Sequence, residues 1–267
     1  MPITTVLFDL GSTLLYSKDP WPPIFERANR ALVEVLQRAG IVMNSASFYA
    51  EFDNFLDTYY DQRGMGTVEV STPTSLTELL ARKGFRNVPE AIIREALDAM
   101  YAITQQNWYL EDDAIPTLEI LQKHGYRLGM ISNTSDDKNV QQLVDRWQLR
   151  PYFEFIVTSA GCGIRKPDER IFRLALDHFD VSPEATAMVG DTLEADILGA
   201  NQIGIHSIWI TRRVEGPDFE AGPLQESIDH SIAYRSESLR PGATISRLNK
   251  IPSLLQQWRN HYVLTRQ

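Results

Sequence analysis

The sequence has little cysteine, no long apolar run and no excess of positive charge. Cys162 is the one cysteine among 267 residues, so no disulfide can form within the chain, as expected in a reducing compartment. No apolar run approaches the roughly 20 residues that cross a bilayer. The N-terminal residues lack the basic stretch and apolar run of a signal peptide. We therefore expect a soluble, cytoplasmic protein with no membrane partner.

Charge argues against a nucleic-acid-binding protein, and histidine usage argues against a metal site built from histidines. The chain has 26 Lys and Arg against 35 Asp and Glu, and its net charge of -9 is unsuited to the phosphate backbone of a nucleic acid. The five histidines show no spacing typical of a metal site. Hydrophobic residues make up 43% of the chain, which is enough for a core. The length fits two domains, or one domain with a large insertion.

Strand and helix patterns alternate in most of the chain. Residues 3–10 form an apolar, β-branched run that stops at Gly11 and Ser12, as a buried strand does at a turn. Further strands are predicted at residues 126–132, 153–159, 186–191 and 206–211, and helices at 114–124, 138–147, 168–178 and 194–202. Alternating strands and helices are typical of βαβ units. We therefore predict an α/β fold with a doubly wound parallel sheet.

A region of different character interrupts this pattern after the first strand. Its apolar residues recur at spacings of three and four, as in Ile24, Ala28 and Leu32, and predict about four helices. We expect an α/β core of residues 1–15 and 107–267 with an all-helical insertion at residues 16–106.

The stretch 212–239 is rich in Gly, Pro and acidic residues, and its length is unusual for a connection within a domain. It fits a surface loop, a short hairpin around Ser231–Tyr234 or a subunit contact.

Polar residues follow four of the predicted strands. They are Asp9, Gly11, Ser12 and Thr13 after the first strand, then Ser132, Asn133 and Thr134, then Gly161, Arg165 and Lys166, and finally Gly190, Asp191, Glu194 and Asp196. Each feature alone has a commoner explanation as a cap, a turn or a solvated lysine. In an open parallel sheet, however, ligands bind beyond the carboxyl ends of the strands. Four such groups in one domain therefore predict a single site.

The residue types in this group suit phosphate chemistry. The carboxylates of Asp9, Asp191 and Asp196 are the oxygen ligands that Mg²⁺ prefers. The Ser132 hydroxyl and the Lys166 ammonium suit phosphate oxygens, and the backbone N–H groups of Gly11 and Ser12 add donors. Asp9 can then attack phosphorus as a covalent nucleophile while the lysine and the metal screen the charge repulsion.

These residues resemble the four motifs of the haloacid dehalogenase-like (HAD) hydrolases, in their phosphatase-type branch with a helical cap. The matching stretches are FDLGSTL with Asp9 and Thr13, ISNT with Ser132, RKPD with Lys166, and VGDTLEAD with Asp191 and Asp196. The resemblance implies a Rossmann-like core and a cap over the site. It also implies a catalytic group of Asp9, Thr13, Ser132 and Lys166, with Asp9 as nucleophile. The implied Mg²⁺ ligands are Asp9, Asp191, Asp196 and the backbone carbonyl of Gly11.

The implied substrate is a small phosphorylated metabolite, held by Gly11, Ser12, Ser132, Asn133 and Lys166. We expect a monomer or a homodimer, with no nucleic-acid partner.

The chain departs from the family pattern at Gly11, where the family has a second aspartate that serves as general acid and base. General acid–base help is typically worth about 10²–10⁴-fold in rate. Three hypotheses follow. The first is a slow or substrate-restricted phosphatase that favours aryl or acyl phosphates. The second is a phosphonate-type C–P hydrolase, for which the insertion offers the lysines Lys18 and Lys83. The third is a non-catalytic relative that binds a phosphorylated ligand or a partner.

Overall fold

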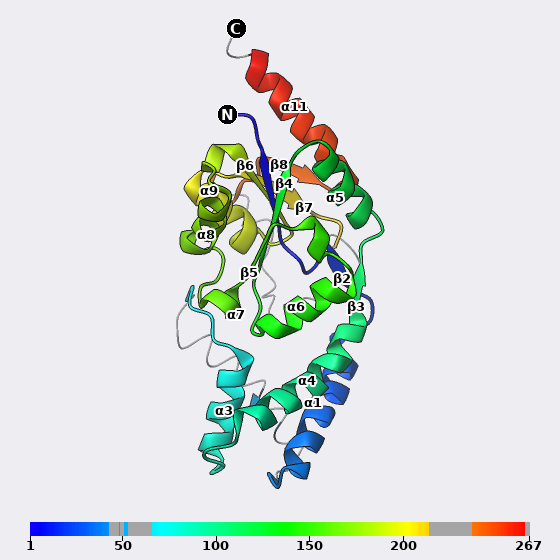
Figure 1. Cartoon of the computed structure of the whole chain (residues 1–267), viewed down its shortest axis with the longest axis vertical. Coiled ribbons are helices and arrows are strands. Elements are labelled where there is room, and N and C mark those ends of the chain that lie inside the picture. Colours follow the sequence, from blue (N-terminus) through cyan, green and yellow to red (C-terminus); the bar gives the residue numbers. More distant parts are fainter. Residues whose placement is uncertain (43–47, 49–50, 53–65, 214–236, 265–267) are drawn as a thin grey trace.

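The computed structural model describes residues 1–42, 48, 51–52, 66–213 and 237–264 (Figure 1). The strands are β1 (Thr5–Phe8), β2 (Leu15–Ser17), β3 (Trp108–Leu110), β4 (Arg127–Ser132), β5 (Phe155–Thr158), β6 (Thr186–Gly190), β7 (His206–Ile210) and β8 (Ala243–Ile245). The helices are α1 (Trp21–Arg38), α3 (Thr72–Arg82), α4 (Glu90–Thr104), α5 (Ala114–Lys123), α6 (Asp137–Arg146), α7 (Ser159–Cys162), α8 (Glu169–Phe179), α9 (Leu198–Ile203) and α11 (Ile251–Leu264). Short turns of 3₁₀ or π helix complete the described elements.

Six parallel strands form the central sheet in the order β5–β4–β1–β6–β7–β8. The chain runs outward from β1 through β4 to β5 and then returns to β6 on the other side of β1. The strand order therefore reverses beside β1, which confirms the doubly wound α/β fold. The carboxyl ends of β4 and β6 flank that of β1.

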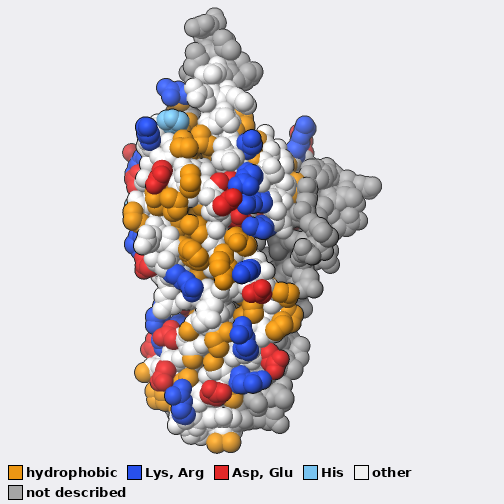
Figure 2. Space-filling model, turned by 90° about the vertical axis from the view of Figure 1, so that its right-hand side faces the viewer, with side chains coloured by type: hydrophobic (Ala, Val, Ile, Leu, Met, Phe, Trp, Pro, Cys, Tyr) orange, Lys and Arg blue, Asp and Glu red, His pale blue; other side chains and the backbone are white. Residues whose placement is uncertain are grey.

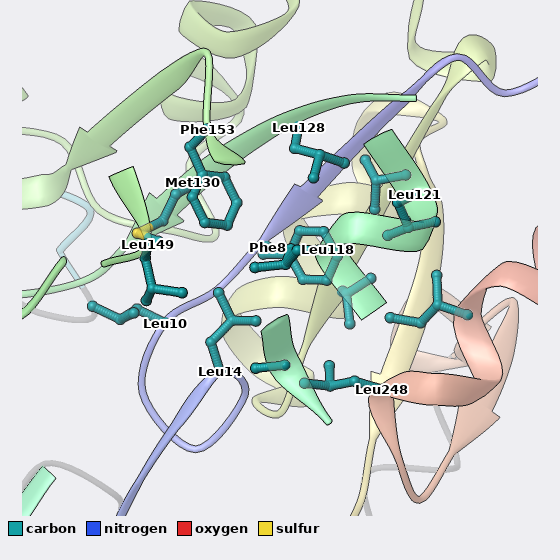
Figure 3. Packing of buried hydrophobic residues seen from close by; sticks show 14 of the residues in the cluster. Phe8, Leu10, Leu14, Leu118, Leu121, Leu128, Met130, Leu149, Phe153 and Leu248 are labelled. Carbon is teal, nitrogen blue, oxygen red and sulfur yellow. The ribbon is translucent and has the colours of Figure 1, made fainter. Parts of the chain in front are cut away.

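Both faces of the sheet are buried because successive side chains of a strand point to opposite faces. Val6 and Phe8 of β1 join an apolar cluster with α5, α6 and α11, and Figure 3 shows Phe8 beside Leu118. Leu7 points the other way and packs with α8 and α9. Buried on both faces, β1 is wholly apolar apart from Thr5 at its start, as parallel strands usually are.

Helices α1, α3 and α4 lie together below the sheet in Figure 1 and share an apolar core of their own. Helix α1 begins at Trp21 with proline in its first turn, where a missing N–H costs nothing. Strands β2 and β3 form an antiparallel ribbon at the two junctions between these helices and the sheet. The sequence pattern predicts only helices here. The ribbon forms because the entering and leaving chains run side by side and pair.

Three features differ from the expected elements. Strand β8 was not predicted, because three residues after a long connection carry no readable period, and helix α11 was not predicted either. The helix expected at 194–202 instead starts as a π-helical turn over Leu193–Ile197 and continues as α9. The hairpin considered around Ser231–Tyr234 lies outside the described residues.

Surface charge and helix composition bear on the partners of the chain. Acidic and basic side chains are interspersed over the face shown in Figure 2. Within the described ranges, no helix combines the length and apolarity needed to cross a membrane.

We expect Phe172→Ala to lower the free energy of unfolding by about 3–5 kcal/mol, because the ring is fully buried between α8, α9 and the sheet. Leu174→Ala on the same helix is the control. That side chain is 39% exposed, and its loss should cost about 0.5 kcal/mol or less. Urea unfolding of both variants measures the difference, and equal losses would contradict this account of the core.

Candidate active site

The site lies at the carboxyl end of β1, where the polar residues predicted from the sequence meet. Asp9 directly follows β1, and its amide donates to the Val189 carbonyl of β6 at 2.9 Å. Ser132 ends β4 on one side, and Asp191 follows β6 on the other. Asp9, Ser132 and Asp191 are all buried. The adjacency of β4, β1 and β6 is what brings them together.

A buried lysine connects these strand ends. Lys166 lies in the loop after α7, and its Nζ donates to Asp9 Oδ1 at 2.7 Å, Asp196 Oδ1 at 2.6 Å and the Ile131 carbonyl at 2.8 Å. Burial by itself lowers the pKa of Lys166, but the carboxylates of Asp196 and Asp9 outweigh burial and hold that pKa above its usual value. The ammonium is therefore a fixed positive charge at the site.

Three carboxylates share the site with this ammonium. Oxygen atoms of Asp9, Asp191 and Asp196 lie within 4.8 Å of one another. The pKa of Asp9 is raised to about 6. Burial is the largest cause, the charge of Lys166 acts against it, and the charge of Asp196 adds to it. Burial, followed by the charges of Asp9 and Asp196, raises the pKa of Asp191 well above its usual value. Acidic groups held this close, with one lysine between them, suit a hard divalent cation.

A glycine allows Asp196 to come this close. A Cβ on Gly190 would lie 2.2 Å from the Asp196 carboxylate, nearer than atoms can approach. Asp196 itself lies in the π-helical turn, and its Oδ2 accepts from the Thr192 amide at 3.0 Å. Gly190 is thus required by space, and the wide turn aims the carboxylate at Lys166.

The loop after β1 turns sharply. Ser12 adopts a left-handed backbone with φ of 56°, and the amides of Leu14 and Leu15 both donate to the Leu10 carbonyl at 2.9 Å. Thr13 is fully buried, and its hydroxyl has no partner among the described residues. A Cβ on Gly11 would lie 3.4 Å from Cη2 of Trp108. Glycine at position 11 is therefore not forced by space.

The Asn133 side chain forms hydrogen bonds with the backbone of Lys166. Its Nδ2 donates to the Lys166 carbonyl at 3.0 Å, and its Oδ1 accepts from the Lys166 amide at 2.9 Å. The sequence-based prediction has this amide bind the phosphate. In the structure both of its polar atoms hold the backbone of Lys166.

A second buried network, missed from the sequence, joins the helical part to the loops of the site. The Ser159 hydroxyl donates to Glu69 Oε2 at 2.7 Å and accepts from the Thr134 amide at 2.8 Å. Glu69 also pairs with Arg165 Nε at 3.3 Å, beside Lys166. Glu69 alone, in an irregular stretch, gave no signal in the sequence.

The lysines considered for a Schiff base have other partners. Lys18 Nζ lies 5.3 Å from the centre of the Tyr109 ring, and Lys83 pairs with Glu51 at the end of α3. Cys162 is also unsuited to be a nucleophile, because burial raises the pKa of its thiol.

The chain is similar to several known proteins. The family described as haloacid dehalogenase-like hydrolase matches residues 3–204. The chain is 31% identical over 233 residues to the ribulose-1,5-bisphosphate 5-phosphatase of Halopiger xanaduensis, which is 86% of this chain and 95% of that protein. It is 33% identical over 154 residues to the phosphoserine phosphatase of Thermus thermophilus, a match that spans 58% of each. Among solved structures, the 2-haloacid dehalogenase of Pseudomonas syringae superposes with a TM-score of 0.68 at 26% identity, over 96% of this chain and 99% of that one.

The raised pKa values predict how stability depends on pH when divalent cations are removed with EDTA. The folded state holds protons on Asp9 and Asp191 more tightly than the unfolded state does. Their contribution to the free energy of unfolding therefore falls as pH rises from about 4 through about 6. In urea at pH 7.5, Asp191→Asn should be more stable than the original protein, and this advantage should shrink at pH 5. Asp177→Asn on the exposed face of α8 is the control, and an advantage independent of pH would contradict the prediction.

Proposed function

The chain belongs to the haloacid dehalogenase-like hydrolase family, and we propose that it is a Mg²⁺-dependent phosphatase that acts through an aspartyl-phosphate on Asp9. The observation that carries this proposal is the Lys166 ammonium, buried between Asp9 and Asp196 at the carboxyl end of β1. A nucleophilic carboxylate must approach a phosphate anion, and a fixed cation beside it reduces the repulsion. The phosphatases among the relatives support the same reaction class.

The carboxylate cluster fits Mg²⁺. Asp9, Asp191 and Asp196 would hold the ion with the backbone carbonyl of Gly11, and the bound ion would supply positive charge to the phosphoryl oxygens. After burial, the charges of Asp9 and Asp196 raise the pKa of Asp191 further, and a bound cation would offset those charges.

The residues of the chain would then have the following roles in the reaction. An Asp9 oxygen attacks phosphorus, the bond to the leaving oxygen breaks, and that oxygen keeps the electron pair. Lys166 and the Ser132 hydroxyl, which is buried at the end of β4, hold phosphoryl oxygens, with the amides of Gly11 and Ser12. Asn133 fixes the backbone of Lys166. Water then attacks the phosphorus of the aspartyl-phosphate, which releases phosphate and restores the Asp9 carboxylate.

We also propose that residues 16–106 form the cap of this enzyme. Their helices share a separate core and contact the core domain beside the site. The Thr72 amide donates to the Ser135 carbonyl at 2.7 Å, and Arg94 pairs with Asp136 at 2.7 Å. Both partners lie in the loop that follows Ser132. A cap attached here would exclude water and contribute to the choice of substrate.

Replacement of the nucleophile tests the proposal directly. With Mg²⁺ and p-nitrophenyl phosphate, Asp9→Asn should lower kcat by about 10³-fold or more. Asp177→Asn should leave kcat unchanged, and EDTA should abolish turnover by the original protein. If folded, Mg²⁺-loaded protein shows no turnover above the Asp9→Asn background, it is instead a binding protein for phosphorylated ligands.

Gly11 should limit turnover of substrates whose leaving group needs a proton. Gly11→Asp should raise kcat/KM for alkyl phosphates by up to about 10²-fold, and less for aryl phosphates, since phenolates leave without an acid. The new side chain fits after a small shift of Trp108, 3.4 Å from its Cβ. Gly11→Asn has the same shape without the acid and is the control. Equal rates for the two variants would contradict the prediction.

A further inference from the structure

An aromatic ring lies where a side chain on residue 11 would project. A Cβ built on Gly11 would be 3.4 Å from Cη2 and 3.8 Å from Cζ3 of Trp108. Gly11 is two residues beyond Asp9, in the loop that follows β1. Because Gly11 carries no side chain, the edge of the six-membered ring of Trp108 lies beside the loop that follows Asp9.

The β2–β3 ribbon determines which side chains face this loop. Trp108 pairs with Ser17 in the ribbon, and its neighbour Tyr109 pairs with Tyr16. Alternate residues of a strand point to opposite faces. Tyr109 accordingly contacts Trp147 and the ammonium of Lys18 on the other face. The Lys18 ammonium therefore lies on the Tyr109 face of the ribbon, and Trp108 presents an aromatic surface on the opposite face.

Two further rings extend this surface. Trp21 lies 5.3 Å from Trp108 between ring centres, and Phe25 stacks on Trp21 at 5.1 Å. Both come from the first turns of α1, and all three side chains are only partly buried. The buried side chain of Asn107 bonds the backbone of Asp19 in both directions, at 2.8 and 2.9 Å, and so holds the start of α1 against Trp108.

We propose that Trp108, with Trp21 and Phe25 behind it, forms an aromatic wall against which an aromatic leaving group packs. The substrates are then aryl phosphate monoesters. This inference rests on the proposed function. Attack by Asp9 breaks the bond between phosphorus and the aryl oxygen, and the electron pair leaves on the phenolate, which takes its proton from solvent water. The aromatic wall and the absent acid at position 11 select the same substrates. The wall binds the aromatic ring, and without an acid the reaction needs a leaving oxygen that departs unprotonated.

Binding of two unreactive ligands tests the contact without turnover. Phenylphosphonate and methylphosphonate share the phosphoryl group and differ in the ring, and calorimetry on the Mg²⁺-loaded protein gives both affinities. The original protein should prefer phenylphosphonate. Trp108→Ala should weaken phenylphosphonate by roughly 2- to 10-fold, the size of one aromatic contact, and leave methylphosphonate unchanged. Trp108→Phe should keep most of the preference, and Trp258→Ala on α11 is the control.

Kinetics give a second readout, because p-nitrophenyl phosphate and acetyl phosphate both release groups that need no acid. Trp108→Ala should raise KM for the aryl substrate and spare the acyl substrate. Equal losses for both substrates, or no preference of the original protein for phenylphosphonate, would overturn the inference. If the protein prefers phenylphosphonate but hydrolyses neither substrate, the proposed function fails and the aromatic contact stands. Hydrolysis without that preference would support the proposed function and refute the aromatic contact.

Discussion

The structure around the site depends on one ammonium held among three buried carboxylates. Lys166 bonds both Asp9 and Asp196. Burial is the main cause that raises the pKa values of Asp9 and Asp191, and the charges of Asp9 and Asp196 raise that of Asp191 further. Buried like charges repel strongly, so only a rigid frame keeps them together. That frame is the adjacency of β4, β1 and β6, with the Lys166 backbone fixed by Asn133. Packing on both faces of the sheet therefore stabilises a site that is unfavourable by itself.

The two glycines of the site differ in whether the space around them allows a side chain. At Gly190 a side chain would collide with Asp196 at 2.2 Å, so the geometry of the carboxylates requires glycine. At Gly11 a side chain would meet only the edge of an indole ring, at ordinary contact distance. Packing therefore does not require glycine at position 11, and the carboxylate cluster forms without a side chain there.

The helical part reaches the site through contacts that the local sequence does not reveal. Glu69 bonds Ser159, which in turn bonds Thr134, and the same carboxylate pairs with Arg165. The β2–β3 ribbon brings Trp108 beside Gly11 from the far end of the insertion. The first connection joins Glu69 to the loops that follow β4 and β5, and the second joins β3 to the loop that follows β1.

The sequence by itself determined the alternation of strands and helices, the helical insertion and the polar residues after each strand, because period and turn chemistry are local. It did not reveal β8, whose three residues are a strand only beside β7. Nor did it reveal that Asn133 holds the backbone of Lys166, or that Trp108 covers Gly11. Those facts depend on which distant segments become neighbours. The tertiary structure alone decided them, since a side chain's partner is chosen by packing and not by its place in the chain.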